Sequence, residues 1–162
     1  MYADPQTQLS PNFKLHEFTA SIMAQRHSID NRLPTDLLAN AMRTVTHIAQ
    51  PVRDHFGIPF GFSSGWRCLA LNRLLKSDDT SDHLKAQACD LEIPGVANLM
   101  LAHWMADNLP DFDKIIFEFY DPEDPAGGWV HGQYRNAATN RNQVLTYDGQ
   151  FKFGLPPLGE FS

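Results

Sequence analysis

The spacing of His83 and Asp90 constrains the fold of this chain more than any other feature. On one continuous strand these residues, seven positions apart, would point to opposite faces, and on a helix they would lie about 10 Å apart along the axis. Residues 84–87 show no strand alternation, whereas residues 88–93 do, and Pro94-Gly95 ends that pattern. If both side chains bind one metal ion, the chain has to turn between them, with His83 on a loop and Asp90 opening a strand.

A third potential ligand, His131, follows Asp90 by 41 residues in the segment Trp129-Val130-His131. Two histidines and a carboxylate are typical of catalytic zinc sites, in which water takes the fourth position. The pair His83 and Asp90 is a weak pattern by itself, but its combination with His131 favours one bound Zn²⁺ per chain over an ordinary polar role. The other histidines lack a partner at metal-binding spacing and are predicted to be structural or solvent-facing: His16, His27, His47, His55 and His103.

Length and charge limit the classes of function. From 162 residues with 43% hydrophobic content, we expect a single domain over residues 1–162 with its own core. Thirteen Lys and Arg against 19 Asp and Glu give a net charge of −6, which disfavours nucleic acid as a partner. No apolar run reaches the ~18 residues of a membrane span, and the N-terminus lacks signal-peptide features. We therefore expect a monomer made in the cytoplasm without membrane insertion.

The two cysteines, Cys68 and Cys89, are too few for a disulfide framework. Cys89 directly precedes Asp90, and strand alternation would point it away from a metal bound by that carboxylate. We therefore predict two buried free thiols, with a disulfide or a cysteine ligand as the alternatives.

Hydrophobic periodicity predicts an α+β organisation. Helical spacing and breaker residues predict helices at Leu15–Ala24, from Pro34 or Thr35 to Phe56, at Cys68–Leu75 and at Val96–Asn108. Pro51 marks the position of a kink in the longest helix. Strands are predicted at Ile58–Ser63, Ala88–Ile93, Lys114–Tyr120, Trp129–Tyr134 and Gln143–Tyr147. The last two are expected to form an antiparallel pair, followed by an extended tail over residues 148–162.

Several motifs, in the same order along the chain, resemble the zinc D-Ala-D-Ala carboxypeptidase family in the form common among bacteriophage peptidoglycan peptidases. The resemblance covers roughly residues 9–147 and is carried by Leu9-Ser10-Pro11-Asn12-Phe13, Ile29-Asp30-Asn31, Ser63-Ser64-Gly65-Trp66-Arg67, Ser81 to Asp90, Trp129-Val130-His131 and Asn140-Arg141. It implies a small α+β domain, shared with the hedgehog signalling domain, in which a twisted antiparallel sheet carries zinc on one face and helices cover the other. It also implies that His83, Asp90 and His131 are the zinc ligands.

Hydrolysis at such a site needs a carboxylate that takes a proton from water and passes it to the leaving amine. Glu118 is the predicted base, because it lies in the apolar segment Ile115–Phe119, where an ionisable group is costly to bury unless it is paired or functional. The alternatives are that Glu118 lies on the solvent face of an edge strand, or that Glu123 or Asp124 in the following loop is the base.

The chain departs from the family pattern at two positions. Several family members carry the catalytic acid three residues before the last histidine, where this chain has Gly128. Ala86 stands where the metal motif of the family usually has glycine. If the backbone at this position needs a positive φ, alanine costs energy because its Cβ clashes in that region.

Three further residues are candidates for substrate binding. Arg67 lies in a segment that resembles one whose arginine faces the substrate in the family, and a guanidinium matches a carboxylate or an oxyanion through two parallel hydrogen bonds. Ser81 is expected to contact the substrate or to orient His83. Trp129 is expected to line the cleft. A surface salt bridge for Arg67 and simple packing for Trp129 are the alternatives.

The sequence therefore predicts a zinc metallopeptidase that hydrolyses peptidoglycan stem peptides, as a D-Ala-D-Ala carboxypeptidase or an endolysin-type endopeptidase. Such a protein would reach the cell wall after release from the cytoplasm, or as part of a virion. A zinc-bearing binding or structural domain without turnover is the alternative from another class. A transition-metal oxygenase with two histidines and one carboxylate is a further alternative, but it would carry a closely spaced His-x-Asp pair.

Overall fold

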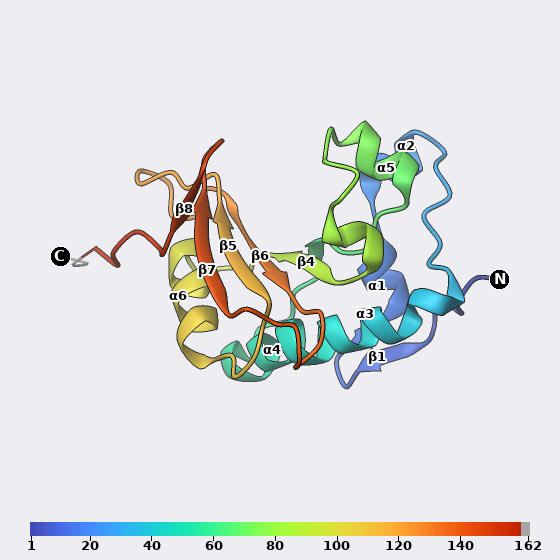
Figure 1. Cartoon of the computed structure of the whole chain (residues 1–162), viewed down its shortest axis with the longest axis horizontal. Coiled ribbons are helices and arrows are strands. Elements are labelled where there is room, and N and C mark those ends of the chain that lie inside the picture. Colours follow the sequence, from blue (N-terminus) through green and yellow to red (C-terminus); the bar gives the residue numbers. More distant parts are fainter. Residues whose placement is uncertain (160–162) are drawn as a thin grey trace.

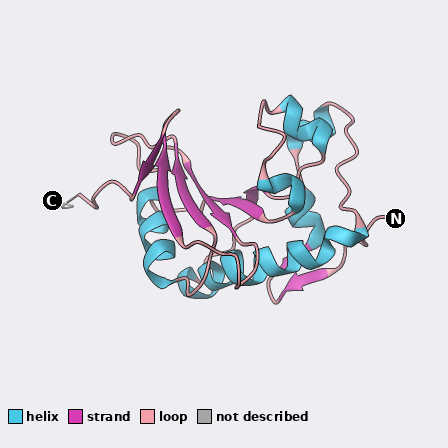
Figure 2. Cartoon of the chain, in the orientation of Figure 1, coloured by secondary structure: helices cyan, strands magenta, loops and turns pink. Residues whose placement is uncertain are grey.

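The computed structural model describes residues 1–159 and contains a six-stranded sheet, a two-stranded sheet and short helices (Figure 1, Figure 2). The α-helices are α1 (Leu15–Thr19), α2 (Ile22–Arg26), α3 (Leu38–Thr44), α4 (Gln50–Phe56), α5 (Leu69–Leu74) and α6 (Asn98–Asn108). Single turns of other helix types are η1 (Thr35–Leu37), η2 (Val45–Ala49) and η3 (Asp82–Lys85). The strands are β1 (Gln8–Ser10), β2 (Phe13–Lys14), β3 (Phe62–Ser64), β4 (Ala88–Leu91), β5 (Lys114–Glu118), β6 (Trp129–Gln133), β7 (Gln143–Tyr147) and β8 (Phe151–Phe153). The predicted α+β fold is confirmed.

The large sheet is mixed, with the strand order β3-β4-β6-β5-β7-β8. Strands β5 and β7 are parallel, and the other neighbouring pairs are antiparallel. The sheet expected to be antiparallel is therefore mixed, with one parallel pair. The expected pairing of β6 with β7 is wrong, because β5 lies between them.

The sequence of β5 explains this central position. Its residues Ile115, Ile116 and Phe117 are consecutive and all buried, so the strand is covered on both faces. A strand of that kind belongs in the interior of a sheet, whereas an edge strand can leave one face polar. The chain that leaves β6 therefore passes β5 and adds β7 on its far side, parallel to β5.

The helices follow the predicted positions with two differences. The predicted helix at Leu15–Ala24 is two short helices, because Ala20 has an extended conformation and the Ser21 side chain then caps α2. The long predicted helix is present as a helical run from Thr35 to Phe56, with the π-helical turn η2 directly before Pro51. Both a π turn and a proline, which cannot donate a backbone hydrogen bond, are typical positions of a bend in a helix.

The helices pack against one face of the sheet and leave the other face for a site. A side chain at Gly132 in β6 would lie 2.4 Å from Ile48 of η2 and 3.2 Å from Met105 of α6, so the sheet and the helices are in close contact here. Strand alternation then directs the neighbouring His131 to the opposite face. Figure 1 shows α4 and α6 on the same side of the strands.

Both cysteines are free thiols, as predicted. Cys89 is buried in the core, on the side of β4 opposite to Asp90, whereas Cys68 is only partly buried. The predicted tail contains the short strand β8, which pairs with β7, and residues 160–162 lie outside the described residues. Within the described part of the chain, no helix combines the length and apolar character needed to cross a membrane.

Candidate metal centre

Three buried side chains converge on the open face of the large sheet. Asp90 in β4 and His131 in β6 are direct partners in the antiparallel register, and His83 comes from η3. One nitrogen or oxygen atom from each of these residues lies within 4.8 Å of the other two. The residues predicted from spacing therefore meet at one point, and this point can hold a metal ion.

The turn that the spacing requires between His83 and Asp90 occurs at Ala86. This residue ends η3 in the left-handed conformation, with φ of 54°, and its N–H donates to carbonyl groups of that turn. Its methyl group is fully buried, and its carbonyl accepts a hydrogen bond of 2.9 Å from Thr44. The chain therefore adopts the glycine-favouring conformation with alanine, at a cost of roughly 1 kcal/mol in backbone strain.

Hydrogen bonds orient the two imidazole rings. His83 donates its Nδ1–H to the carbonyl of Gly65 at 2.7 Å, so that its Nε2 faces Asp90 Oδ1 at 3.4 Å. His131 presents its Nδ1 to the same carboxylate oxygen at 2.9 Å. Zinc is typically bound by such nitrogen and carboxylate ligands, with a carbonyl or carboxylate holding the second ring nitrogen. The residues present therefore fit a zinc ion.

Burial and mutual charge shift the pKa values of these groups. Burial lowers the pKa of His83. Burial alone would also lower the pKa of His131, but the hydrogen bond and charge of Asp90 outweigh it and raise this pKa. The neighbouring imidazoles hold the pKa of Asp90 well below its ordinary value, in spite of its burial. The carboxylate is therefore ionised over the whole physiological range, as a metal ligand must be.

Glu118 lies beside the three converging residues. Its Oε1 is 3.8 Å from His131 Nδ1, and its side chain is 21% exposed. Burial raises the pKa of Glu118, with a further contribution from the charge of Asp90. The strand β5 is an interior strand, so the alternative of a solvent-facing glutamate at a sheet edge does not hold.

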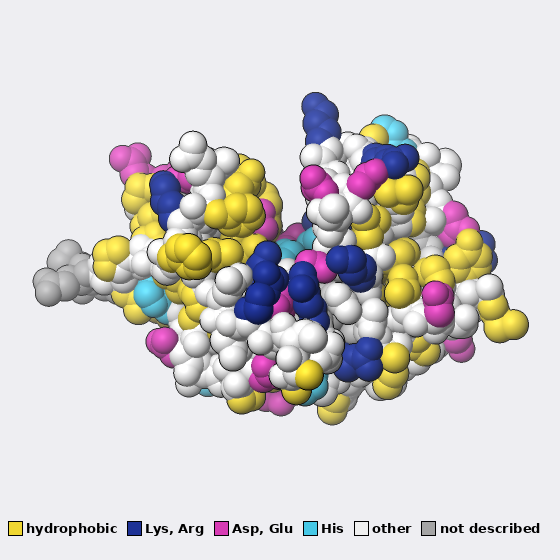
Figure 3. Space-filling model, viewed as in Figure 1, with side chains coloured by type: hydrophobic (Ala, Val, Ile, Leu, Met, Phe, Trp, Pro, Cys, Tyr) yellow, Lys and Arg dark blue, Asp and Glu magenta, His cyan; other side chains and the backbone are white. Residues whose placement is uncertain are grey.

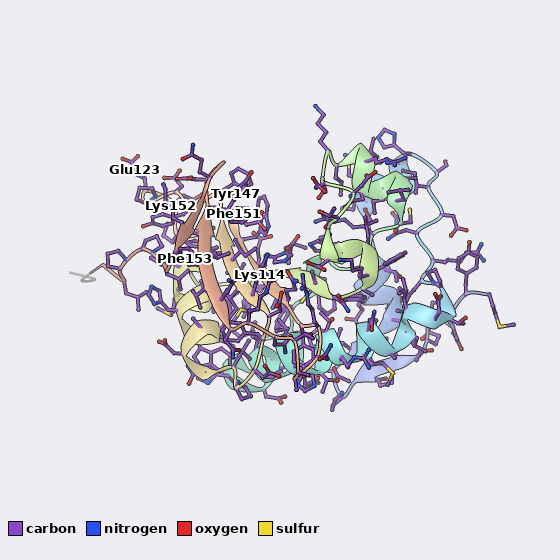
Figure 4. All side chains as sticks on the ribbon, in the orientation of Figure 1. Lys114, Glu123, Tyr147, Phe151, Lys152 and Phe153 are labelled. Carbon is purple, nitrogen blue, oxygen red and sulfur yellow. The ribbon has the colours of Figure 1, made fainter. Side chains whose placement is uncertain are left out.

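The structure explains why the chain carries glycine at position 128. Gly128 has φ of +68°, and a Cβ at this position would lie 2.0 Å from the carbonyl oxygen of Glu118. An acidic side chain has no room here. The loop that holds Glu123 and Asp124 is exposed, and neither residue lines the cavity that contains His83 and His131. Figure 4 shows Glu123 at the periphery of the molecule. Of the three candidate bases Glu118, Glu123 and Asp124, Glu118 alone lines the cavity of the site.

Arg67 contacts Asp90, one of the three converging residues. Its Nη2 donates to Asp90 Oδ2 at 3.0 Å, its Nε donates to Ser64 at 2.8 Å, and its side chain is 12% exposed. It is therefore a partly buried ion pair at the site and not a surface salt bridge. Ser81 accepts a hydrogen bond from the backbone N–H of His83 at 3.4 Å and so caps η3.

The site lies on the floor of a cleft between the sheet and the α2 and α5 region (Figure 3). One cavity of about 700 Å³ contains His83, Asp90, Glu118 and His131 in its lining. A neighbouring cavity of about 630 Å³ extends toward α2 and is lined by more apolar residues. Trp129 lines both cavities and is partly exposed, so it is not a residue of the packed core.

A buried polar network behind His131 was not predicted from the sequence. The Gln133 side-chain amide donates to Asp82 and to Asp113 at 2.7 Å each, and Arg141 donates two hydrogen bonds to the fully buried Asp113 at 2.8 and 2.7 Å. A hydrogen bond with Gln133 also contributes to the raised pKa of His131. Strand alternation could have indicated Gln133, which lies two residues after His131 on the same face. The two aspartates come from distant segments and have no local signal.

The remaining histidines lie outside the site, as predicted. His47 stacks on Tyr134 and His55 stacks on Trp104, while His103 bonds to the carbonyl of Pro156. The other two, His16 and His27, are exposed.

A comparison with protein families gives one match, to the family described as Peptidase M15, over residues 11–117. The matched segment includes Arg67, His83 and Asp90 and ends just before Glu118 and His131, which the sheet register adds to the site. No curated protein matches the chain.

Proposed function

The chain belongs to the Peptidase M15 family, whose members are zinc metallopeptidases that act on peptidoglycan, and on this basis we propose that it hydrolyses a peptide bond in peptidoglycan stem peptides. The finer proposal is cleavage of D-Ala-D-Ala or of a nearby bond that involves a D-residue. The main support for the proposed peptidase activity is the convergence of His83, Asp90 and His131 beside Glu118 on the floor of an open cleft.

The proposed metal ligands are His83 Nε2, Asp90 Oδ1 and His131 Nδ1, the atoms that face one another in the site. A bound zinc ion supplies a water of lowered pKa and polarises the carbonyl of the scissile bond. The three residues would hold the ion with three protein ligands, which is the number typical of a catalytic rather than a structural zinc site.

Glu118 is the proposed general base. Glu118 lies next to His131 but is not one of the three proposed ligands. Its carboxylate is therefore free to accept the proton of the nucleophilic water and to donate it to the leaving amine. Burial raises the pKa of Glu118, which makes its carboxylate a stronger base toward the proton of the water than an ordinary glutamate.

Arg67, Ser81 and Trp129 are proposed to bind the substrate. Arg67 uses Nη2 and Nε to contact Asp90 and Ser64, so its remaining N–H groups are available to a carboxylate or to the oxyanion of the tetrahedral intermediate. Ser81 and Trp129 both line the cavity that contains the three proposed ligands. A protein made in the cytoplasm would need release, or assembly into a virion, to reach this substrate.

The test is incubation of the zinc-loaded protein with a wall pentapeptide that ends in D-Ala-D-Ala, followed by mass spectrometry of the products. The expected result is a new pair of fragments whose masses identify the bond. The matched control is Glu118→Gln, which keeps the shape of the side chain and removes its basicity. Absence of any product from the unmodified protein would favour a zinc-bearing binding domain of the same fold.

A further inference from the structure

We propose that an aromatic wall beside the metal centre binds a sugar ring of the peptidoglycan glycan, so that the preferred substrate is a stem peptide still attached to its amino sugar. The aromatic wall consists of Phe119, Trp129, Tyr147 and Phe151, all of which line the cavity that contains the metal centre. This inference rests on the proposed function for the identity of the substrate. It adds a binding site that the metal ligands and the general base do not use.

The register of the sheet places this wall in line with the general base. Glu118 pairs with Trp129 on one side and with Tyr147 on the other, and Tyr147 pairs with Phe151. Residues paired in this way project from the same face, so the row runs from the metal centre toward the sheet edge at β8. Figure 4 shows Tyr147 and Phe151 close together at the cleft end of their strands, and Figure 3 shows hydrophobic side chains on this side of the cleft.

The rings form a continuous apolar surface. The ring centroids of Phe119 and Trp129 are 5.2 Å apart, those of Phe119 and Tyr147 are 5.6 Å apart, and those of Tyr147 and Phe151 are 4.7 Å apart. These separations are typical of favourable aromatic pairs. Phe119 is 49% exposed and Phe151 is 62% exposed, so the wall faces the cavity and not the core. An exposed apolar surface of this kind marks a binding surface more often than a structural feature.

The backbone of Phe119 supports a functional role for the wall. Its φ is 55°, a left-handed conformation that is unfavourable for a large L-residue. Strand alternation would direct the residue after Glu118 to the helical face, but this conformation brings its ring to Trp129 and Tyr147 on the open face. Backbone strain of this kind is concentrated at ligand-binding sites. The strained backbone conformation of Phe119 therefore places its ring in the aromatic wall.

The facing side of the same cavity is polar. Its lining includes Lys76, Ser77, Asp78 and Ser81. The carboxylate of Asp78 is held in place by the backbone N–H and the hydroxyl of Thr80, at 2.7 and 2.6 Å through Oδ1, which leaves Oδ2 available to a ligand. The cavity thus has one aromatic side and one side rich in hydrogen-bonding groups.

A pyranose ring matches this division. Its faces carry C–H groups that pack on aromatic rings, and its edge carries hydroxyl groups and, in the peptidoglycan sugars, an acetamido group that forms hydrogen bonds. The small methyl side chains of a D-Ala-containing peptide would cover little of a surface made of four rings. The observations therefore favour the sugar over the peptide as the occupant of the wall.

The test measures binding separately from turnover. Zinc-loaded Glu118→Gln protein is titrated by calorimetry with three probes: the free wall pentapeptide, the same peptide attached to the GlcNAc–MurNAc disaccharide, and the disaccharide alone. We expect the attached sugar to tighten binding about tenfold relative to the free peptide, and the disaccharide alone to bind weakly but measurably. Adding Phe151→Ala or Tyr147→Ala should remove this tenfold difference.

The matched control is Phe153→Ala. Phe153 lies on β8, as Phe151 does, and is 87% exposed, but it does not line the cavity. This variant should keep the preference for the sugar-bearing peptide. If the two peptides bind equally well, or if Phe151→Ala weakens both by the same factor, the sugar assignment is wrong. Hydrolysis of the free pentapeptide by the unmodified protein is scored independently, so a failed peptidase assay and a failed sugar preference are distinguishable.

Discussion

At the scale of single residues, some groups of the site could be predicted from the sequence, whereas others are identified only by the register of the strands. His83, Asp90 and His131 could be predicted because their spacing excludes one continuous element and their types suit one metal ion. Glu118 could be predicted because a carboxylate interrupts an apolar run. Gln133 could not, because its partners Asp82 and Asp113 are set by the alignment of β6 with β5 and by the position of η3.

Replacement of Glu118, the proposed general base, should separate the effect on catalysis from the effect on metal binding. We expect Glu118→Gln to lower kcat by about 10²- to 10⁴-fold, which is the usual contribution of a positioned general base. The zinc content should stay the same, because Glu118 is not among the three converging residues. Steady-state kinetics together with metal analysis checks both parts. A variant with an unchanged rate would remove Glu118 from the mechanism.

The network behind His131 should contribute to zinc affinity. Gln133→Leu removes the amide that links Asp82 and Asp113 to the back of the ligand ring, so we expect zinc affinity to fall about 10- to 100-fold. Competition against a chelator of known affinity measures this change. The control is Gln143→Leu, because Gln143 lies in the same row of the sheet but two strands away from β6. Equal affinities in the two variants would show that the network does not position the ligand.

At the scale of elements, the tight approach of two chain segments beside the site explains a departure from the family pattern. The loop before β6 passes so close to the end of β5 that only glycine fits at position 128. The chain therefore could not keep an acid at this position and instead has Glu118 on β5. The sequence shows that position 128 lacks the acid of the family pattern. It does not show why, because the cause is the contact of Gly128 with the backbone of Glu118, ten residues earlier.

Substitution at this contact should be costly. We expect Gly128→Ala to lower the free energy of unfolding by roughly 3 kcal/mol, because it combines a positive φ with a steric clash against backbone. Gly95→Ala is the matched control: it also has a positive φ, of +77°, but no described atom lies within 4 Å of the added methyl group. Its cost should be about 1 to 2 kcal/mol, from backbone strain only. Urea unfolding compares the two, and equal losses would contradict the steric argument.

The arrangement of strands shows where sequence reasoning fails at this scale. The positions of β4, β5, β6 and β7 agree with prediction to within a few residues, but the pairing of β6 with β7 does not. Proximity along the chain suggested a hairpin, whereas burial of β5 on both faces is typical of a strand in the interior of a sheet. The interior position of β5 could have been predicted from its three consecutive apolar residues Ile115, Ile116 and Phe117, because apolar and polar residues alternate in an edge strand.

At the scale of the whole molecule, the sheet has the core on one face and the candidate metal centre on the other. The predicted fold class and the family agree with the structure, and the mixed sheet is the main correction. Trp129 could be predicted to line the cleft, but the other rings of the aromatic wall could not, because they depend on which residues of neighbouring strands fall in the same row.

Zinc binding should stabilise the whole molecule. The three ligands come from η3, β4 and β6, so an ion that binds the folded state and not the unfolded chain ties these elements together. At free zinc a thousandfold above Kd the stabilisation is about 4 kcal/mol, which corresponds to a rise in Tm of roughly 10 °C for a domain of this size. Calorimetry with and without chelator measures it. His131→Ala should show a much smaller shift, and a Tm of the unmodified protein that is independent of zinc would contradict the proposed ligand set.

The most direct test of the central claim is a zinc titration of the metal-free protein with peptide hydrolysis as the readout. The rate of cleavage of the wall pentapeptide should rise in proportion to added zinc and reach its plateau at about one equivalent per chain. The His83→Ala variant should give no such rise. A rate that does not depend on zinc, or a fully loaded protein that releases no fragment from the peptide, would contradict the account of His83, Asp90 and His131 as a catalytic metal centre.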